Sequence, residues 1–146
     1  MTSIYLENLA KIKQLDTVPA SPELGLNKLE SARKRLRDAG VKSISNETRF
    51  DAAYNAIRDC SEVGLLMHGY RTTSKPGHHQ IAMQSLVHTL GIEERTVQVL
   101  DGLRKVRHLS DYDGDTVPDS TLADCVRLAA ELVTRTEAAL TSKGWL

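Results

Sequence analysis

The stretch TLADCVRLAAELVTRTEAAL, residues 121–140, carries apolar side chains at three- and four-residue intervals. Side chains at this spacing lie on one face of an α-helix, which turns once in about 3.6 residues. Pro118 precedes the stretch, and Asp119 or Ser120 is expected to cap the first amides of the helix. The stretch therefore predicts a long amphipathic helix, whose core-facing residues are Leu122, Cys125, Val126, Ala129, Leu132, Val133, Thr136, Ala139 and Leu140.

The same periodicity occurs in three earlier stretches and predicts three further long helices. One begins after a cap at Ser45 or Asn46 and ends near Gly69, another closes at Gly40, and the third begins near Ile92. Their apolar faces are, in that order, Phe50, Ala53, Tyr54, Ile57, Cys60, Gly64 and Met67; Leu26, Leu29, Ala32, Leu36 and Ala39; and Val99, Leu103 and Val106.

Long helices with short connections predict an all-α fold, an up-and-down bundle of four main helices with one or two short additional helices. The short helices are expected over residues 4–15 and 79–90. No alternation of β-branched and aromatic residues indicates a strand, and aromatic residues make up only 4% of the chain. The break TVPASP at 17–22 separates a leading short helix and linker, residues 1–22, from the bundle of residues 23–146. The core is expected to include Tyr54, Ile57, Leu103, Leu132 and Val133.

The composition of the 146-residue chain excludes several classes of protein. Lysine plus arginine equals aspartate plus glutamate at 19 each, so no overall field attracts nucleic acid or anionic lipid, and an RNA contact needs a local patch. The longest apolar run, residues 63–67, is too short to cross a bilayer, and the first residues lack a signal-peptide core. Cys60 and Cys125 lie in apolar stripes and are expected to be buried thiols. These features predict a cytoplasmic protein with no membrane segment.

Two segments of the chain resemble HEPN-type bacterial proteins. Residues 45–86 resemble the first core helix pair of that family, through AYNA at 53–56 and the GYR and GHH connection at 69–79. Residues 100–115, LDGLRKVRHLSDYDGD, resemble the LR..RN..DY.GD segment that the family carries on a later long helix. The resemblance covers roughly residues 24–140.

The resemblance implies a helical bundle that often dimerises, and an activity found in many members. These members cleave RNA without a metal in toxin–antitoxin, CRISPR and phage-defence systems. Their catalytic motif is an arginine followed, after four to six residues, by a histidine, and in some toxins by a tyrosine shortly afterwards. The arginine binds the scissile phosphate, and the histidine moves a proton at the ribose 2′-hydroxyl or the leaving oxygen. The resemblance makes Arg104, His108 and Tyr112 the candidate catalytic residues of this chain, and Arg107 and Asp111 of the same stretch are the candidate binding residues.

The spacing of these residues differs from the family motif and leaves three interpretations open. Three residues separate Arg104 from His108, one fewer than the family minimum, and the histidine position counted from Arg107 is occupied by Tyr112. Helix geometry places Arg107 between two leucines, hence partly buried, with Asp111 one turn on as the nearest carboxylate. The first interpretation is a structural Arg107–Asp111 pair. The second is a groove between two protomers in which Arg104, His108 and Tyr112 contact phosphate or a protein partner, and the third is a solvated face.

Three other patterns could suggest a ligand, and each has a simpler structural interpretation. The histidines at 78–79 lack the Cys or Glu that completes a metal site, and are expected to open a helix. The three aspartates within 111–115 do not fit a calcium loop, and are expected to form a helix exit with Gly114 at positive φ. The basic stretch of residues 28–42 could receive RNA phosphates, but its interspersed acidic residues favour a solvated polar face. No metal and no cofactor are expected.

Two classes of function remain. The chain is expected to be a HEPN-type protein of a bacterial conflict system, either toxin–antitoxin or phage defence, acting as a divergent metal-independent ribonuclease. The alternative is a non-catalytic HEPN-type binding module or inhibitor that acts through protein–protein interaction. The expected partners are RNA, an antitoxin or defence-complex subunit, and a second copy of the chain in a C2 dimer formed through the Arg104–Tyr112 face.

Overall fold

Four long helices form the body of the fold, which the computed structural model describes for residues 3–146 apart from the side chain of Tyr112. These helices are α2 (Pro22–Ala39), α3 (Asn46–Met67), α6 (Glu94–Asp113) and α7 (Asp119–Lys143). The remaining elements of the described residues are short: α1 (Ile4–Lys11), β1 (Leu15–Thr17), β2 (Tyr70–Thr72), α4 (His78–Gln84) and α5 (Leu86–Thr89).

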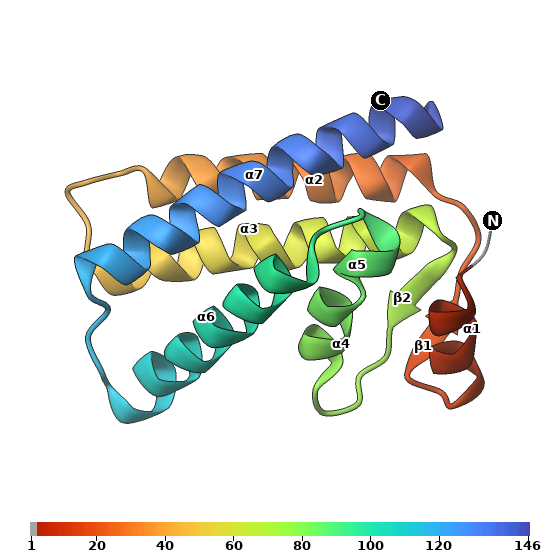
Figure 1. The fold of residues 1–146 in the computed structure, drawn as a ribbon. Helices are drawn as coiled ribbons and strands as arrows, with labels where there is room; N and C mark the ends of the chain where they lie inside the picture. Colours follow the sequence, from red (N-terminus) through yellow and green to blue (C-terminus); the bar gives the residue numbers. More distant parts are fainter. Residues whose placement is uncertain (1–2) are drawn as a thin grey trace.

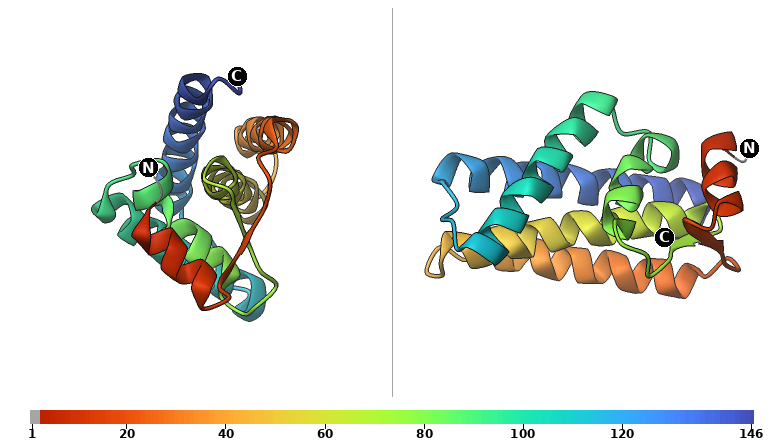
Figure 2. Two further views of the ribbon diagram at one scale, coloured as in Figure 1. Left: turned by 90° about the vertical axis from the view of Figure 1, so that its right-hand side faces the viewer. Right: turned by 90° about the horizontal axis from the view of Figure 1, so that it is seen from below.

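The long helices α2, α3 and α7 lie side by side, and α6 runs obliquely past α3 and α7 on the side away from α2 (Figures 1 and 2). Each long helix reverses the direction of the long helix before it (Figure 1). The short helices α4 and α5 lie beside α3 and α6, whereas α1 and both strands lie at one end of the bundle. The predicted all-α, up-and-down bundle is confirmed.

The main core lies where α2, α3 and α7 face one another, and it extends beneath α6. Fully burying a large apolar side chain contributes roughly 1.5–3 kcal/mol, so this cluster is the main source of stability. The two cysteines belong to it as free, buried thiols, and burial raises the pKa of each to about 12. The predicted core residues are all confirmed as buried: Tyr54, Ile57, Leu103, Leu132 and Val133.

Hydrogen bonds join the starting turns of α3 and α7. Ser45 caps α3 as predicted, because its side chain accepts a hydrogen bond from a backbone amide of the first turn. Asn46 Nδ2 donates to the carbonyl of Val117 at 3.0 Å and to Asp119 Oδ1 at 2.7 Å. The predicted side-chain cap of α7 is wrong: Pro118 holds the N-cap position, and the Asp119 carboxylate is used by Asn46 instead.

The two short strands form an antiparallel pair that the sequence did not predict. The leading helix, expected to reach residue 15, ends at Lys11, and the chain turns at Lys13, where φ is 63°. Leu15 then enters a strand because its side chain is buried in a separate apolar cluster with Leu6, Leu65, Tyr70 and Ala82. A strand of three residues is too short to show alternation in the sequence. The paired residues are Leu15 with Thr72, Asp16 with Arg71 and Thr17 with Tyr70.

The helix expected over residues 79–90 is two short helices divided at Ser85. Ser85 Oγ donates to the carbonyl oxygen of Ile81 at 2.7 Å, a bond that Ser61 and Thr136 also make within the unbroken helices α3 and α7. The predicted exit from the helix that begins near Ile92 is confirmed, since Gly114 follows α6 with a φ of 72°. α4 contacts α6, and Gln80 Nε2 of α4 donates to Asp101 Oδ1 of α6 at 3.4 Å.

Candidate functional site

A cleft of ≈ 430 Å³ lies where α6 faces the turn that leads into α4. Its lining comes from three parts of the chain: Tyr54 on α3, residues 74–80 around the start of α4, and one face of α6. The α6 residues are four of the five site residues predicted from the sequence, namely Arg104, Arg107, His108 and Asp111. The side chain of the fifth, Tyr112, lies outside the described residues.

Arg107 is anchored to α3 more strongly than to its own helix. Its side chain is 29% exposed, and Nε donates to Asp51 Oδ1 at 2.9 Å. The predicted pair with Asp111 is present at 3.7 Å, and the guanidinium also lies over the Tyr54 ring, 5.1 Å from its centroid. Burial lowers the pKa of Arg107, but the hydrogen bond and charge of Asp51 outweigh it and leave the pKa raised. Arg107 therefore remains a cation that ties α6 to α3.

Arg104 is held within α6, one turn from Arg107. Its Nε donates to Asp101 Oδ1 at 2.9 Å, and the same carboxylate contacts Lys105 Nζ at 3.6 Å. The hydrogen bond from Arg104 lowers the pKa of Asp101. Gln80 of α4 donates to Asp101 at 3.4 Å, so this carboxylate also links α6 to α4. His108, the next turn along, is an exposed residue of the cleft wall.

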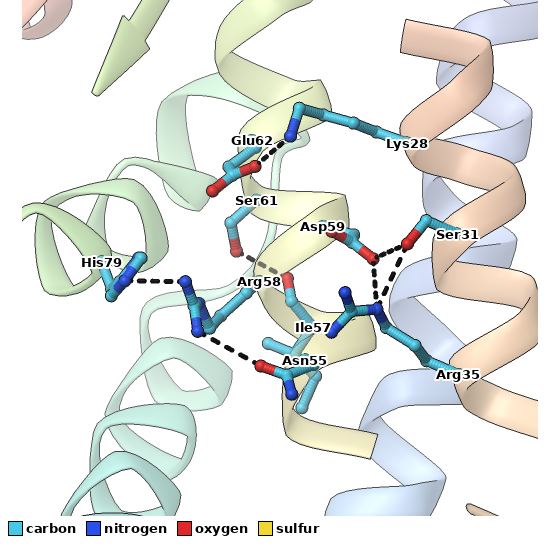
Figure 3. Close-up of polar contacts among 10 residues, drawn as sticks. All are labelled: Lys28, Ser31, Arg35, Asn55, Ile57, Arg58, Asp59, Ser61, Glu62 and His79. Atoms are coloured by element: carbon cyan, nitrogen blue, oxygen red, sulfur yellow. Dashed lines mark hydrogen bonds and ion pairs between the residues drawn. The ribbon is translucent and has the colours of Figure 1, made fainter. Parts of the chain in front are cut away.

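The two histidines at the start of α4 are part of the same cleft. They open a helix as predicted, and their rings lie with centroids 3.8 Å apart. His79 Nε2 contacts Arg58 Nη2 at 2.7 Å, across the space between α4 and α3 (Figure 3). Burial, followed by the charge of Arg58, lowers the pKa of His79 to about 4, so this imidazole is neutral at pH 7. From the sequence, these histidines were expected only to open a helix, with no role in a site.

A continuous polar chain crosses α3 behind the cleft. Arg107 donates to Asp51, Asn55 Nδ2 donates to the other oxygen of Asp51 at 3.4 Å, and Arg58 Nη1 donates to Asn55 Oδ1 at 3.2 Å. Arg58 then reaches His79 (Figure 3). Asp51, Asn55 and Arg58 were not predicted as site residues, because the apolar periodicity marks only the opposite face of this helix. They follow one another at intervals of four and three residues, which places all three on one polar face, and this spacing is the signal in the sequence that could have identified them.

Three of the five basic residues of α2 contact carboxylates of neighbouring helices. Lys28 Nζ contacts Glu62 Oε2 at 2.5 Å, and Arg35 Nε contacts Asp59 Oδ2 at 3.3 Å (Figure 3). Arg33 pairs with Glu137 of α7. These ion pairs join α2 to α3 and α7, and they support a structural role for most of the basic stretch at residues 28–42.

A larger cavity, of ≈ 610 Å³, lies between the α5–α6 connection and α7. Its charged lining has both signs, with Glu93 and Glu131 beside Arg127 and Arg135. Arg135 is occupied in holding that connection, because its Nη2 donates to the carbonyls at residues 90 and 91 at 3.1 and 3.0 Å. The cavity is larger than the α4–α6 cleft, but no histidine lines it. The role of its Arg135 is structural, since this residue holds the α5–α6 connection against α7.

Comparisons with known proteins give no further assignment: no family model matches the chain, and no curated protein matches it. Within residues 3–146, no three His, Cys, Asp or Glu side chains gather as metal ligands. None of the helices described combines the length and apolar character needed to span a membrane. The candidate site therefore rests on the geometry of the α4–α6 cleft.

Proposed function

We propose that this chain is a cytoplasmic HEPN-type protein of a bacterial conflict system, acting on RNA at the α4–α6 cleft as a divergent metal-independent ribonuclease. The observation that carries the proposal is the presence of Arg104, Arg107 and His108 along one wall of the same cleft. Guanidinium groups bind phosphate oxygens through charge-assisted hydrogen bonds, and an imidazole can exchange protons near neutral pH. The helical bundle and the two sequence segments that resemble HEPN proteins support the family assignment.

The proposed reaction uses the ribose as its own nucleophile. His108 accepts the proton of the 2′-hydroxyl, whose oxygen attacks the adjacent phosphorus as the bond from phosphorus to the 5′ oxygen breaks. Water protonates the leaving 5′ oxygen, so the products are a 2′,3′-cyclic phosphate and a 5′-hydroxyl end. The arginines offset the negative charge that grows on the phosphate oxygens in the transition state.

The test is cleavage of total bacterial RNA by the purified protein in excess chelator. We expect Arg104→Ala and His108→Ala to lower the rate at least about tenfold, a loss of about 1.4 kcal/mol of transition-state stabilisation. Arg127→Ala is the matched control, because this α7 arginine is 59% exposed and does not line the cleft. Full activity of both cleft variants would contradict the proposal that the α4–α6 cleft cleaves RNA.

One observation favours the alternative, a non-catalytic module or inhibitor that acts through protein–protein interaction. Arg104 and Arg107 each already contact a carboxylate, Asp101 and Asp51 respectively, which offsets part of their charge. Retention of a co-purified antitoxin without RNA cleavage, lost in Arg104→Ala, is the result expected for this alternative. Cleavage by the wild-type protein contradicts it.

We also propose that two copies assemble as a C2 dimer through α6. Support comes from two large apolar side chains of α6 that remain exposed, Val99 at 44% and Leu109 at 43%, and from the resemblance to bundles that dimerise. Light scattering at tens of micromolar is expected to give twice the 16.1 kDa of one chain, and Leu109→Glu is expected to return the mass to one chain. A wild-type mass of one chain contradicts the dimer.

A further inference from the structure

Arg58 is a half-buried cation whose described contacts are all with neutral groups. It donates to Asn55 Oδ1 and contacts His79 Nε2, and its Nε is buried with no hydrogen-bond partner in the described part of the chain. Burial lowers the pKa of Arg58 and the positive charge of Arg107 lowers it further, whereas the charges of Glu62 and Asp59 act in the opposite direction. These two carboxylates form no direct ion pair with Arg58 among the described residues, whereas Arg35, Arg104 and Arg107 each contact a carboxylate. A half-buried charge with no direct ion pair costs stability, so packing alone does not account for it.

Arg58 determines which nitrogen of His79 carries the proton. A guanidinium has only donors, so His79 Nε2 must accept from Arg58 Nη2. In a neutral imidazole the other nitrogen then carries the hydrogen, so His79 is the Nδ1–H tautomer. Within the described residues this Nδ1–H forms no hydrogen bond, while His79 itself lines the cleft. His79, a residue of the cleft lining, therefore carries an N–H donor on a ring that Arg58 contacts from α3.

The positive charge of the cleft comes from the opposite wall. Arg104 and Arg107 both line the cleft, and each uses its Nε in a hydrogen bond of 2.9 Å to a carboxylate. Arg107 Nη1 also lies 3.7 Å from Asp111, a carboxylate of the cleft lining. A guanidinium has five N–H donors, so each arginine keeps others for a ligand. Two guanidinium groups facing a neutral N–H donor match the oxygens of a phosphate group, which accept hydrogen bonds and carry negative charge.

We infer that the cleft binds one phosphate group between His79 and the arginines of α6, and that Arg58 is the positioning residue that orients His79 toward it. The ligand class is a phosphate group, either an internal phosphodiester of RNA or a terminal phosphate. The inference rests on the proposed function only for the source of that phosphate.

Nitrogen-15 NMR of the histidine side chains tests the tautomer and the ligand together. We expect His79 in wild-type protein to show the Nδ1–H pattern, and its signals to move on titration with inorganic phosphate. His79→Gln is expected to weaken phosphate binding at least about tenfold. Signals of His79 that do not respond to inorganic phosphate or to either oligonucleotide described below would overturn the inference.

Two variants of Arg58 distinguish the proposed role in positioning His79 from a purely structural role. Arg58→Met keeps the apolar stem but removes the donors, and is expected to give a mixture of His79 tautomers and about tenfold weaker phosphate binding. Its melting temperature is expected to equal or exceed that of the wild type, because the variant removes a half-buried charge that has no direct ion pair. Arg58→Lys keeps a donor and is expected to retain the tautomer and most of the affinity. A lower melting temperature or failure to fold in Arg58→Met, or phosphate binding equal to wild type, contradicts the positioning role.

Two short oligoribonucleotides, identical except for a 5′-phosphate or a 5′-hydroxyl, identify the source of the phosphate. Equal affinities that depend on His79 assign the ligand to an internal phosphodiester, and preference for the phosphorylated oligonucleotide assigns it to a chain end. Phosphate binding that depends on His79 in a protein that does not cleave RNA supports the inference and removes the ribonuclease proposal. RNA cleavage that is unchanged in His79→Gln supports the ribonuclease and removes the inference.

Discussion

The two sides of α3 contrast in chemistry although they belong to one helix. The side that faces α2 and α7 buries apolar residues such as Phe50, Ile57 and Cys60 in the main core. The side that faces α4 and α6 carries Asp51 and Arg58, which form the polar chain behind the cleft. The first side is held by non-directional burial and the second by directed contacts between charged and polar groups. Stability and the candidate site can therefore be changed separately by substitutions on the same helix.

The largest expected effect is on the apolar side. Phe50 is 1% exposed, and Phe50→Ala should lower the free energy of unfolding by about 3–5 kcal/mol, through lost burial and the cavity left behind. Val41→Ala in the α2–α3 connection is the matched control, since its side chain is 43% exposed and its loss should cost no more than about 0.5 kcal/mol. Urea denaturation measures both. A cost below 1 kcal/mol for Phe50→Ala would mean that the core assigned to α3 is wrong.

An intermediate effect is expected on the polar side, where two arginines of α6 differ in their anchoring. Arg107→Ala removes the contact with Asp51 on another helix and the cation–π contact with Tyr54, and should cost roughly 1–3 kcal/mol. Arg104→Ala removes a pair within one helix and should cost less than about 1 kcal/mol. Thermal or urea melts compare the two. Equal costs would show that the link between α6 and α3 does not depend on Arg107.

The smallest expected effect is the pH dependence that His79 contributes. The folded protein holds the pKa of His79 at about 4, below its ordinary value of 6.5, so the unfolded chain binds more protons between these values. Stability should therefore fall as pH falls from 6.5 to 4, by about 1–2 kcal/mol after allowance for solvent screening of this partly exposed group. His79→Gln should flatten this part of the curve, measured by urea melts across the range. An unchanged slope would show that His79 is not held neutral by folding.

The sequence predicts the bundle because its long helices repeat apolar residues over many turns, so the periodic signal accumulates. The same signal fails for β1, where three residues show no period, and at Ser85, where two short helices stand in place of the single helix expected over residues 79–90. The α6 wall of the cleft was predictable because Arg104, Arg107 and His108 share one segment. The opposite wall was not, because the contacts of Arg58 and Asp51 with α4 and α6 depend on how separate helices pack.

The pairing of β1 with β2 has a consequence for the order of folding. The strands are far apart in sequence, and α2 and α3 occupy the chain between them. Closing so long a flexible loop directly is entropically unfavourable, but an antiparallel α2–α3 hairpin brings both strands to the same end of the molecule. We therefore expect the helical hairpin, rich in local contacts, to form first and to bring the two strands together. On the same reasoning, the N-terminal segment is expected to dock late in folding and to detach first during unfolding.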